Sequence, residues 1–534
     1  MIKKIQNLFQ DAKRRRTNFD NAWTDISIWF RPNRGDFNNK DSEGSLRDQR
    51  KVHAAPPLAV KKLASKITTS LTDLTVNKFK IVPVTEEAQD DEEIRKLASD
   101  NTFNMRNILQ HPHLNFATSN QNFTEDWCAF GTAVMELKEV DHFPFMATKA
   151  VHLNDIYILE NHLGMVDVVF HKLEVTGRQL LQQFDSSVLP ENILKQATKD
   201  PAEKICIYKV AMSSEDAKTF LDIKGLSKHV VAYMDEDLSA VFKEVHLDYF
   251  PYLVSRYSVA TDELYGRSPA WDGLPYARRI SALQIPYANS LIRSLVPTVI
   301  TSDDSVLPKG LMKPGQRIDG GIDFSTGQRT IDYLQYPTNL QAGREEEQWL
   351  IDKINELFLV QGLPDNKNVR MTQVEVQARL AELQSLAPNV SRLVIEYINP
   401  LLTTLYRFWV KKGLLKKKPK ELNNIPLEFN LSGALANVHR FAEIESVQTM
   451  YNLISVIGAI NPQVAALPKH EEILRLVADI LNVPDKVIKS NSELQQEATQ
   501  AAEAQQQAQS LQAAQGLSEA GLNAARAAEI QGGV

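Results

Sequence analysis

The sequence predicts an α+β protein in which a large mixed domain carries a helical stalk with a β-rich insert at its far end. Three observations lead to this prediction. The first half contains strand-like runs separated by turns, two helical stretches flank a Gly- and Pro-rich insert, and a very long helical pattern follows. The strands do not alternate regularly with helices, which favours α+β over a repeated βαβ arrangement.

Composition and charge narrow the class of protein. The chain has 534 residues, 43% hydrophobic and 24% charged, enough for roughly two to four domains. A net charge of −6 argues against a strong non-specific grip on nucleic acid, although contact with DNA stays open. Two cysteines, Cys128 and Cys206, favour a reducing compartment. We expect neither a secretory signal nor a membrane span, because the apolar runs are too short.

The N-terminal part is predicted to be helical. Residues 1–30 form an amphipathic pattern, with apolar residues spaced mainly by three, four and seven, that ends at Arg31-Pro32. The basic cluster 13–16 is best explained as a solvated helix face, with nucleic-acid binding as the alternative. Further helices are expected over 57–74, 91–110 and from Phe116 to Gly131.

Between Val134 and Tyr257 most signals are those of β-strands, interrupted by a helix over 177–184. The strand candidates are short runs between turns, at 166–170, 204–212, 229–234 and 240–247. This region therefore supplies the sheet of the α+β domain.

The stalk begins with a helix over 274–295 and returns through a second helix over 344–360. The insert between them, 301–343, is rich in glycine and proline. We expect it to form short strands around Val306, Ile318, Ile331 and Tyr333. Such an order suits a ring of subunits built around a channel better than it suits an enzyme.

A polar loop, Gly362–Asn368, precedes the longest helix. Thr372 and Glu375 form a capping box, and apolar residues then recur every three or four positions as far as Trp409. Pro388 and Pro400 should each kink this helix, since proline removes a backbone hydrogen bond.

The C-terminal region begins with a strand candidate at 427–431 and a helical block at 434–490. The Gln- and Ala-rich tail, 491–534, carries too little apolar surface for a core.

A search for catalytic chemistry finds no motif. There is no G-x-S-x-G or H-E-x-x-H pattern, and in the glycine-containing run 310–317 Gln316 stands where a phosphate-binding loop needs lysine. His111 and His113 have no partner ligands at metal spacing. We therefore predict no catalytic residues, no metal and no cofactor. An enzyme whose site is assembled from distant residues remains an alternative.

Five short stretches carry a resemblance to a known family, and their order is more specific than any one of them. They are Leu63–Leu71 (LASKITTSL), Glu125–Gly131 (EDWCAFG), Leu264–Ala270 (LYGRSPA), Met371–Val376 (MTQVEV) and Leu431–Leu435 (LSGAL). Over almost its whole length the chain resembles the portal proteins, or head-to-tail connectors, of T7-like short-tailed bacteriophages. A tail adaptor or an internal core protein is the alternative within the virion.

The resemblance implies a portal fold assembled as a ring, usually a dodecamer, at one capsid vertex of the virion. Its ring assembles in the host cytoplasm and forms the channel for DNA packaging and ejection. The parts implied are the wing (1–260), stem (261–300 and 343–360), clip (301–342), tunnel loop (361–372), a long kinked helix returning to the wing (373–430), the crown (431–490) and the tail (491–534).

The resemblance also implies partners. The clip would bind terminase, which carries the ATP-hydrolysing motor, during packaging and the tail adaptor afterwards. Major capsid protein, scaffolding protein and internal core proteins are further expected neighbours, and double-stranded DNA would be contacted independently of its sequence. The clip residues expected to dock terminase and the tail adaptor are Lys309, Lys313, Arg317, Asp319, Asp323 and Arg329.

Two further sets of residues are predicted to act in the ring. In the tunnel loop, Lys367 and Arg370 outnumber Asp365, which favours contact with phosphate, with a solvated outward turn as the alternative. The loop residues are Asp365, Asn366, Lys367, Asn368 and Arg370. The apolar stem residues, which we expect neighbouring subunits to cover, are Ile280, Leu283, Leu291, Ile354, Leu357 and Phe358.

Overall fold

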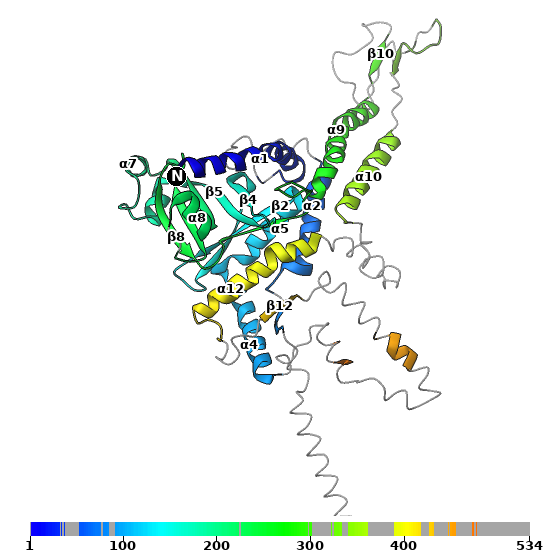
Figure 1. Cartoon of the computed structure of the whole chain (residues 1–534). Coiled ribbons are helices and arrows are strands. Elements are labelled where there is room, and N and C mark those ends of the chain that lie inside the picture. The colour runs from blue at the N-terminus through cyan, green and yellow to red at the C-terminus, as the bar shows by residue number, and fades with distance from the viewer. Residues whose placement is uncertain are drawn as a thin grey trace, which may run out of the picture. The chain divides into compact units, whose positions relative to one another are not determined.

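The computed structural model divides the chain into two compact units, residues 1–438 and 439–534 (Figure 1). It describes residues 2–32, 34, 37, 53–75, 78–84, 91–223, 226–296, 298–301, 322, 325–333, 340–360, 389–417 and 427–431. In the second unit it describes only 447, 449–454, 473–474 and 477, which are helical. The predicted tunnel loop, the predicted tail and most of the predicted crown lie outside the described residues.

The N-terminal helices form where the apolar periodicity predicted them. α1 (Ile2–Phe30) buries Ile5, Trp23 and Ile26 in the core of the first unit. α2 (Ala55–Ile67) continues into a π-helical turn, Thr68–Thr72, and α4 (Glu92–Leu109) begins after Asp91, whose carboxylate accepts from Glu93 and Ile94 N–H. α5 (Phe116–Phe130) ends at Gly131, which has a left-handed φ of 82°.

Two antiparallel sheets follow in the same unit. The five-stranded sheet has the sequential order β4-β5-β6-β7-β8, and the three-stranded sheet has the order β3-β2-β9. The first consists of β4 (Ile156–Glu160), β5 (Val166–Thr176), β6 (Lys204–Ser213), β7 (His229–Met234) and β8 (Val241–Leu247), and the second of β2 (Thr132–Glu139), β3 (Met146–Val151) and β9 (Tyr252–Arg256). Three short helices lie between strands: α6 (Gly177–Gln183), α7 (Glu191–Lys199) and α8 (Ser214–Leu221).

Buried polar side chains join the two sheets. Lys209 on β6 donates to Glu136 on β2 at 2.6 Å, and His171 Nδ1 on β5 lies 2.9 Å from the Tyr252 hydroxyl on β9. Burial by itself raises the pKa of Glu136, but the cations Lys209 and Lys149 and the neighbouring His171 lower that pKa to about 2. The ion pair therefore stays charged between the sheets.

A third pairing brings the C-terminal part of the first unit back to its N-terminal part. β1 (Phe79–Pro83) pairs antiparallel with β12 (Leu427–Leu431), with Phe79 opposite Leu431. The predicted strand 427–431 is confirmed, whereas its pairing with β1 was not predicted. The segment after the long helix is held to the same region, because Lys416 N–H donates to Asn101 Oδ1 on α4.

The long predicted helix is described from Asn389 to Lys411. It contains a π-helical turn, Val394–Ile398, followed by α12 (Asn399–Lys411), which buries Leu401, Leu405 and Trp409. A wide turn thus ends two residues before Pro400, where a kink was predicted. The residues around Pro388 lie outside the described part.

The mixed helix and sheet content agrees with the predicted α+β class. The strands expected at 166–170, 204–212, 229–234 and 240–247 are all present, and the helix expected over 177–184 is α6. Among the described residues 79–256, the strands β1, β3, β4 and β9 and the helices α7 and α8 were not predicted. They are short, and β1 and β9 pair with strands that are distant in the sequence.

Candidate functional site: the stem and its root

Two helices, α9 (Pro269–Leu295) and α10 (Leu340–Leu357), lie side by side and form the stem (Figure 1). Arg279 pairs with Glu346 at 2.7 Å, and Arg344 Nε donates to the Tyr287 hydroxyl at 3.0 Å. A Cβ on Gly343 would lie 3.0 Å from the Tyr287 ring, so glycine allows the helices to approach closely there. Both helices begin earlier than their predicted starts at 274 and 344.

After α9 comes a short antiparallel strand pair, of which one strand lies in the region predicted as the clip and the other straddles the predicted boundary between stem and clip. β10 (Val299–Thr301) pairs with β11 (Ile331–Tyr333), with Ile300 opposite Asp332. The strand expected around Ile331 and Tyr333 is therefore present. The strands expected around Val306 and Ile318 lie outside the described residues.

The root of the stem is a close contact between two of the sequence motifs, 125–131 and 264–270. A Cβ on Gly266 would lie only 2.2 Å from the Gly131 carbonyl oxygen, so this crossing requires glycine. Gly266 N–H donates to Thr132 Oγ1 at 2.8 Å. Ser268 Oγ donates to the Ala129 carbonyl and accepts from Ala270 N–H, which caps α9. The sequence indicated each motif separately but not their contact.

The end of α1 is joined to the same root by charge. Arg31 pairs with Glu125 at 2.9 Å and with Asp126, and Arg34 pairs with Asp126 at 2.7 Å. Burial, followed by the neighbouring Arg34, lowers the pKa of Arg31 to about 10, so the guanidinium remains charged at neutral pH. Two arginines and two carboxylates therefore fix α5 against the segment that follows α1.

The base of the stem is buried within the chain itself, which corrects part of the sequence prediction. Ile280, Ile354 and Phe358 are fully buried, and Phe358 lies 5.5 Å from Phe30 between ring centroids. Neighbouring subunits are therefore not needed to cover these three residues, because the first unit buries them itself, with Phe30 at the end of α1 against Phe358. Leu283 and Leu357 pack partly against the same core. Among the six predicted stem residues, Leu291 is the exposed one, at 37%.

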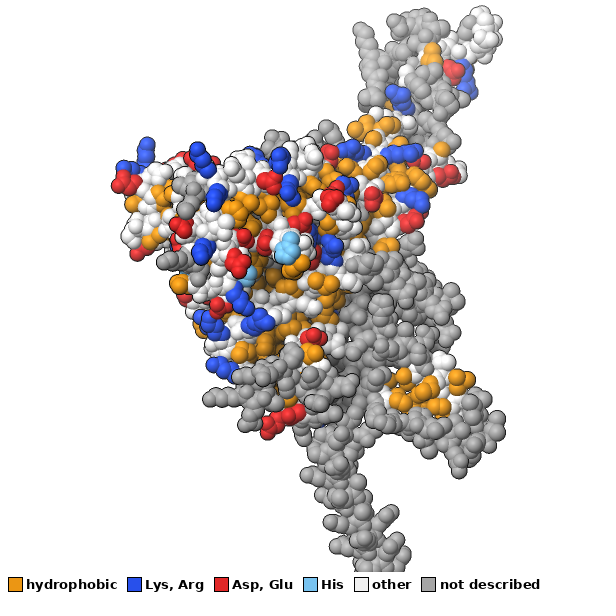
Figure 2. All heavy atoms as spheres, viewed as in Figure 1, with side chains coloured by type: hydrophobic (Ala, Val, Ile, Leu, Met, Phe, Trp, Pro, Cys, Tyr) orange, Lys and Arg blue, Asp and Glu red, His pale blue; other side chains and the backbone are white. Residues whose placement is uncertain are grey.

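The outer half of α9 exposes an apolar stripe, which consists of Ile285, Ile292, Leu295 and Val296. Their exposed fractions are 59%, 58%, 72% and 62%. Ile285 and Ile292 are seven residues apart, which places them on one helix face, while Leu295 ends the helix and Val296 directly follows it. Leu283 and Tyr287, which are partly covered, lie on another face of the helix. Figure 2 shows hydrophobic side chains on the surface of the stem.

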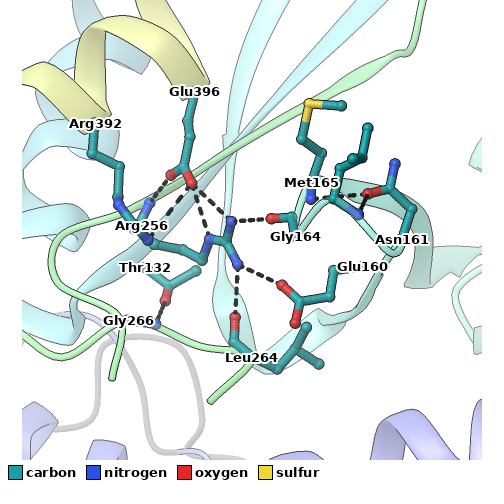
Figure 3. A network of polar contacts seen from close by, with 11 residues as sticks. Thr132, Glu160, Asn161, Gly164, Met165, Arg256, Leu264, Gly266, Arg392 and Glu396 are labelled. Atoms are coloured by element: carbon teal, nitrogen blue, oxygen red, sulfur yellow. Dashed lines mark hydrogen bonds and ion pairs between the residues drawn. The ribbon is translucent and has the colours of Figure 1, made fainter. Parts of the chain in front are cut away.

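A buried arginine anchors the helix that follows the predicted tunnel loop. Arg256 on β9 bonds to Glu396 in the π-helical turn, to Glu160 at the end of β4 and to the Gly164 carbonyl in the following turn (Figure 3). It also donates to the Leu264 carbonyl, two residues before Gly266. No sequence motif singled out Arg256, since its partners lie 8 to 140 residues away.

Of the residues predicted to dock partners or contact DNA, the structure describes Arg329. Arg329 is exposed and forms an isolated bridge with Ile322. The other five predicted clip residues and all five predicted tunnel-loop residues lie outside the described part of the chain.

The part of the molecule that the structure describes offers little for binding a metal or for nucleophilic catalysis. There, His, Cys, Asp and Glu form no group of three or more that could hold a metal ion. Burial raises the pKa of the Cys128 thiol, so that thiol is not an activated nucleophile. Over the same residues, no helix combines the length and apolar character needed to cross a membrane.

Comparison with known proteins identifies the class to which this architecture belongs. Residues 2–488 match the family described as bacteriophage head to tail connecting protein, and the chain belongs to that family. It is 21% identical over 506 residues to the probable portal protein of Bordetella phage BPP-1, covering 90% of this chain and 89% of that protein. It is 22% identical over 503 residues to the portal protein of Salmonella phage epsilon15, covering 90% and 88%.

Membership of this family settles the broad class. The chain is a structural connector of a phage virion and not an enzyme. The resemblance to head-to-tail connectors is confirmed, and the enzyme alternative is set aside.

Proposed function

We propose that the chain forms a closed ring, expected to be a dodecamer, at one vertex of the phage capsid. Double-stranded DNA would pass through its channel during packaging and ejection. The observation that carries the proposal is the apolar stripe on the outer half of α9. Four large apolar side chains exposed on the outer half of α9 and directly after it are costly in water unless another surface covers them.

A second copy of the chain is the occupant that best fits this stripe. In a ring every subunit presents two different surfaces, so an apolar face on one stem meets another surface of the next stem. Trp349 on α10 is 44% exposed and offers one apolar side chain for such a contact. The family, whose members connect head to tail, supports the same assembly.

The remaining parts of the function follow from the stem's position in the chain. The clip (301–342) follows the outer end of α9, and we assign it the docking of terminase and then of the tail adaptor. The tunnel loop (361–372) is assigned to sequence-independent contact with DNA. Capsid, scaffolding and internal core proteins would contact the wing or crown, and assembly would take place in the host cytoplasm.

The apolar stripe gives the test of this proposal. Changing Ile285 and Ile292 together to Glu should prevent ring formation, because both charges would be buried between stems. Native mass spectrometry of the purified protein would measure the oligomer. Ser294→Glu adds a charge at another exposed position of the same helix and serves as the matched control.

The result has two clear readings. We expect a large homo-oligomer for the wild type and the control, and monomers for the double variant. Full-size oligomers of the double variant would overturn the assignment of the stripe to the subunit interface.

A further inference from the structure

The helix after the predicted tunnel loop has an unusual turn at the point where it meets the body. In Val394–Ile398 the helix is π-helical, and the N–H of Asn399 bonds to the Val394 carbonyl, five residues back. Such turns insert one extra residue into a helix and need a local reason to persist. Pro400 favours the wide turn because it has no N–H, but it does not determine which side chains the turn presents.

Arg256 on β9 supplies a specific reason, because it binds Glu396, which lies within this turn. The backbone N–H of Arg256 donates to Glu396 Oε2 at 2.7 Å. Its side chain donates to Glu396 Oε1 from Nε at 3.2 Å and from Nη2 at 2.8 Å. Both oxygens of one carboxylate are thus held by one residue, which fixes position as well as charge.

The rest of the guanidinium is committed to other segments. Nη1 donates to Glu160 at 2.9 Å and to the Leu264 carbonyl at 3.4 Å, and Nη2 donates to the Gly164 carbonyl at 2.7 Å. With the two bonds to Glu396, all five side-chain donors of Arg256 are used. Asn161 Oδ1 accepts from the N–H groups of Leu163 and Met165, which flank Gly164, so the turn that holds the Gly164 carbonyl has its own hydrogen bonds (Figure 3).

The register of the helix depends on this arrangement. C-terminal to the turn, α12 is fixed by buried side chains and by the bond from Trp409 Nε1 to the Pro144 carbonyl at 3.1 Å. Converting the π turn to an α turn would therefore rotate the residues N-terminal to it by about 100°, the angle of one helical residue. The same rotation would move Glu396 away from Arg256.

We propose that Arg256 is a positioning residue whose bonds to Glu396 select the π-helical register of this helix. The pairing thereby sets the rotation at which the chain enters the body at Asn389. Through Leu264 the same residue bonds to the segment before α9, so the stem root and this helix share one anchor. That this rotation aims the tunnel loop rests on the proposed function, whereas the choice of register does not.

Hydrogen exchange measured by mass spectrometry on the full chain tests the register directly. In Glu396→Gln, amides in 389–398 should exchange about tenfold faster or more, the factor expected from losing a charge-assisted hydrogen bond. Amides in 401–411 should remain as in the wild type. Arg392→Gln is the matched control, since Arg392 approaches Glu396 only to 3.9 Å and is half-exposed. Its exchange should match the wild type.

The outcomes separate cleanly. Wild-type exchange in Glu396→Gln, or equal acceleration in Arg392→Gln, would overturn the proposal. If residues 401–411 also exchange faster in Glu396→Gln, the measurement is made on Arg256→Lys, because lysine keeps the charge but lacks the planar fork. In Arg256→Lys, faster exchange confined to 389–398 supports the proposal, and exchange equal to the wild type overturns it. None of these readings depends on ring formation, which native mass spectrometry reports separately.

Discussion

Acid should weaken the body of the protein through His171, which lies between the two sheets. Burial is the main cause that lowers the pKa of His171 to about 4, from an ordinary value of 6.5. Glu136 opposes the shift, and Lys209 and Lys149 add to it. In the unfolded chain the imidazole takes up a proton as the pH falls through 6.5, while in the folded chain it stays neutral until about pH 4. The stability that His171 contributes is therefore fully present above pH 6.5 and is lost as the pH falls towards 4.

The size of the effect follows from the two pKa values. A pH of 5 lies 1.5 units below the pKa of 6.5, so the imidazole is protonated in the unfolded chain. In the folded chain, with a pKa of about 4, it is still neutral. At about 1.4 kcal/mol per pH unit, the free energy of unfolding should fall by about 2 kcal/mol between pH 7 and pH 5 because of this residue. Gln at position 171 keeps a polar group beside Tyr252 and does not titrate.

Urea denaturation at pH 7 and pH 5 measures the difference. The wild type should lose about 2 kcal/mol more between these pH values than His171→Gln does. His162→Gln removes an exposed histidine and should lose as much as the wild type. Equal losses in the wild type and in His171→Gln would refute the reasoning.

Three further outcomes follow from the stem and its neighbouring segments. Gly266→Ala should destabilise the chain by about 2 kcal/mol or more, measured by urea denaturation, because the added methyl meets the Gly131 carbonyl; unchanged stability would contradict the close crossing. Changing Lys367 and Arg370 together to Ala should leave rings intact and lower the DNA retained in heads, and normal retention would remove the role assigned to that loop. Deleting 306–333 should keep rings but abolish binding of terminase and adaptor in pull-down assays; normal adaptor binding would show the clip assignment to be wrong.

The sequence predicted those parts of the fold that local patterns determine. The helix over residues 1–30, the strand 427–431 and the stem helices depend on periodicity and capping, which are visible in a single sequence. Asp91 before α4 and Ser268 before α9 cap these helices through side-chain contacts two or three residues away.

Other features depend on long-range contacts and were not predictable in this way. The pairing of β1 with β12 joins residues about 350 positions apart, and Arg256 binds Glu396 across 140 positions. The error over Ile280, Ile354 and Phe358 has the same origin: their apolar character was correct, but the sequence did not reveal that the chain buries them itself, as Phe30 does against Phe358.

Electron microscopy of the purified full chain in negative stain tests the central claim most directly. The proposed function predicts closed rings with a central hole, made of one kind of subunit. A population that remains monomeric at micromolar concentration, without rings, would contradict it.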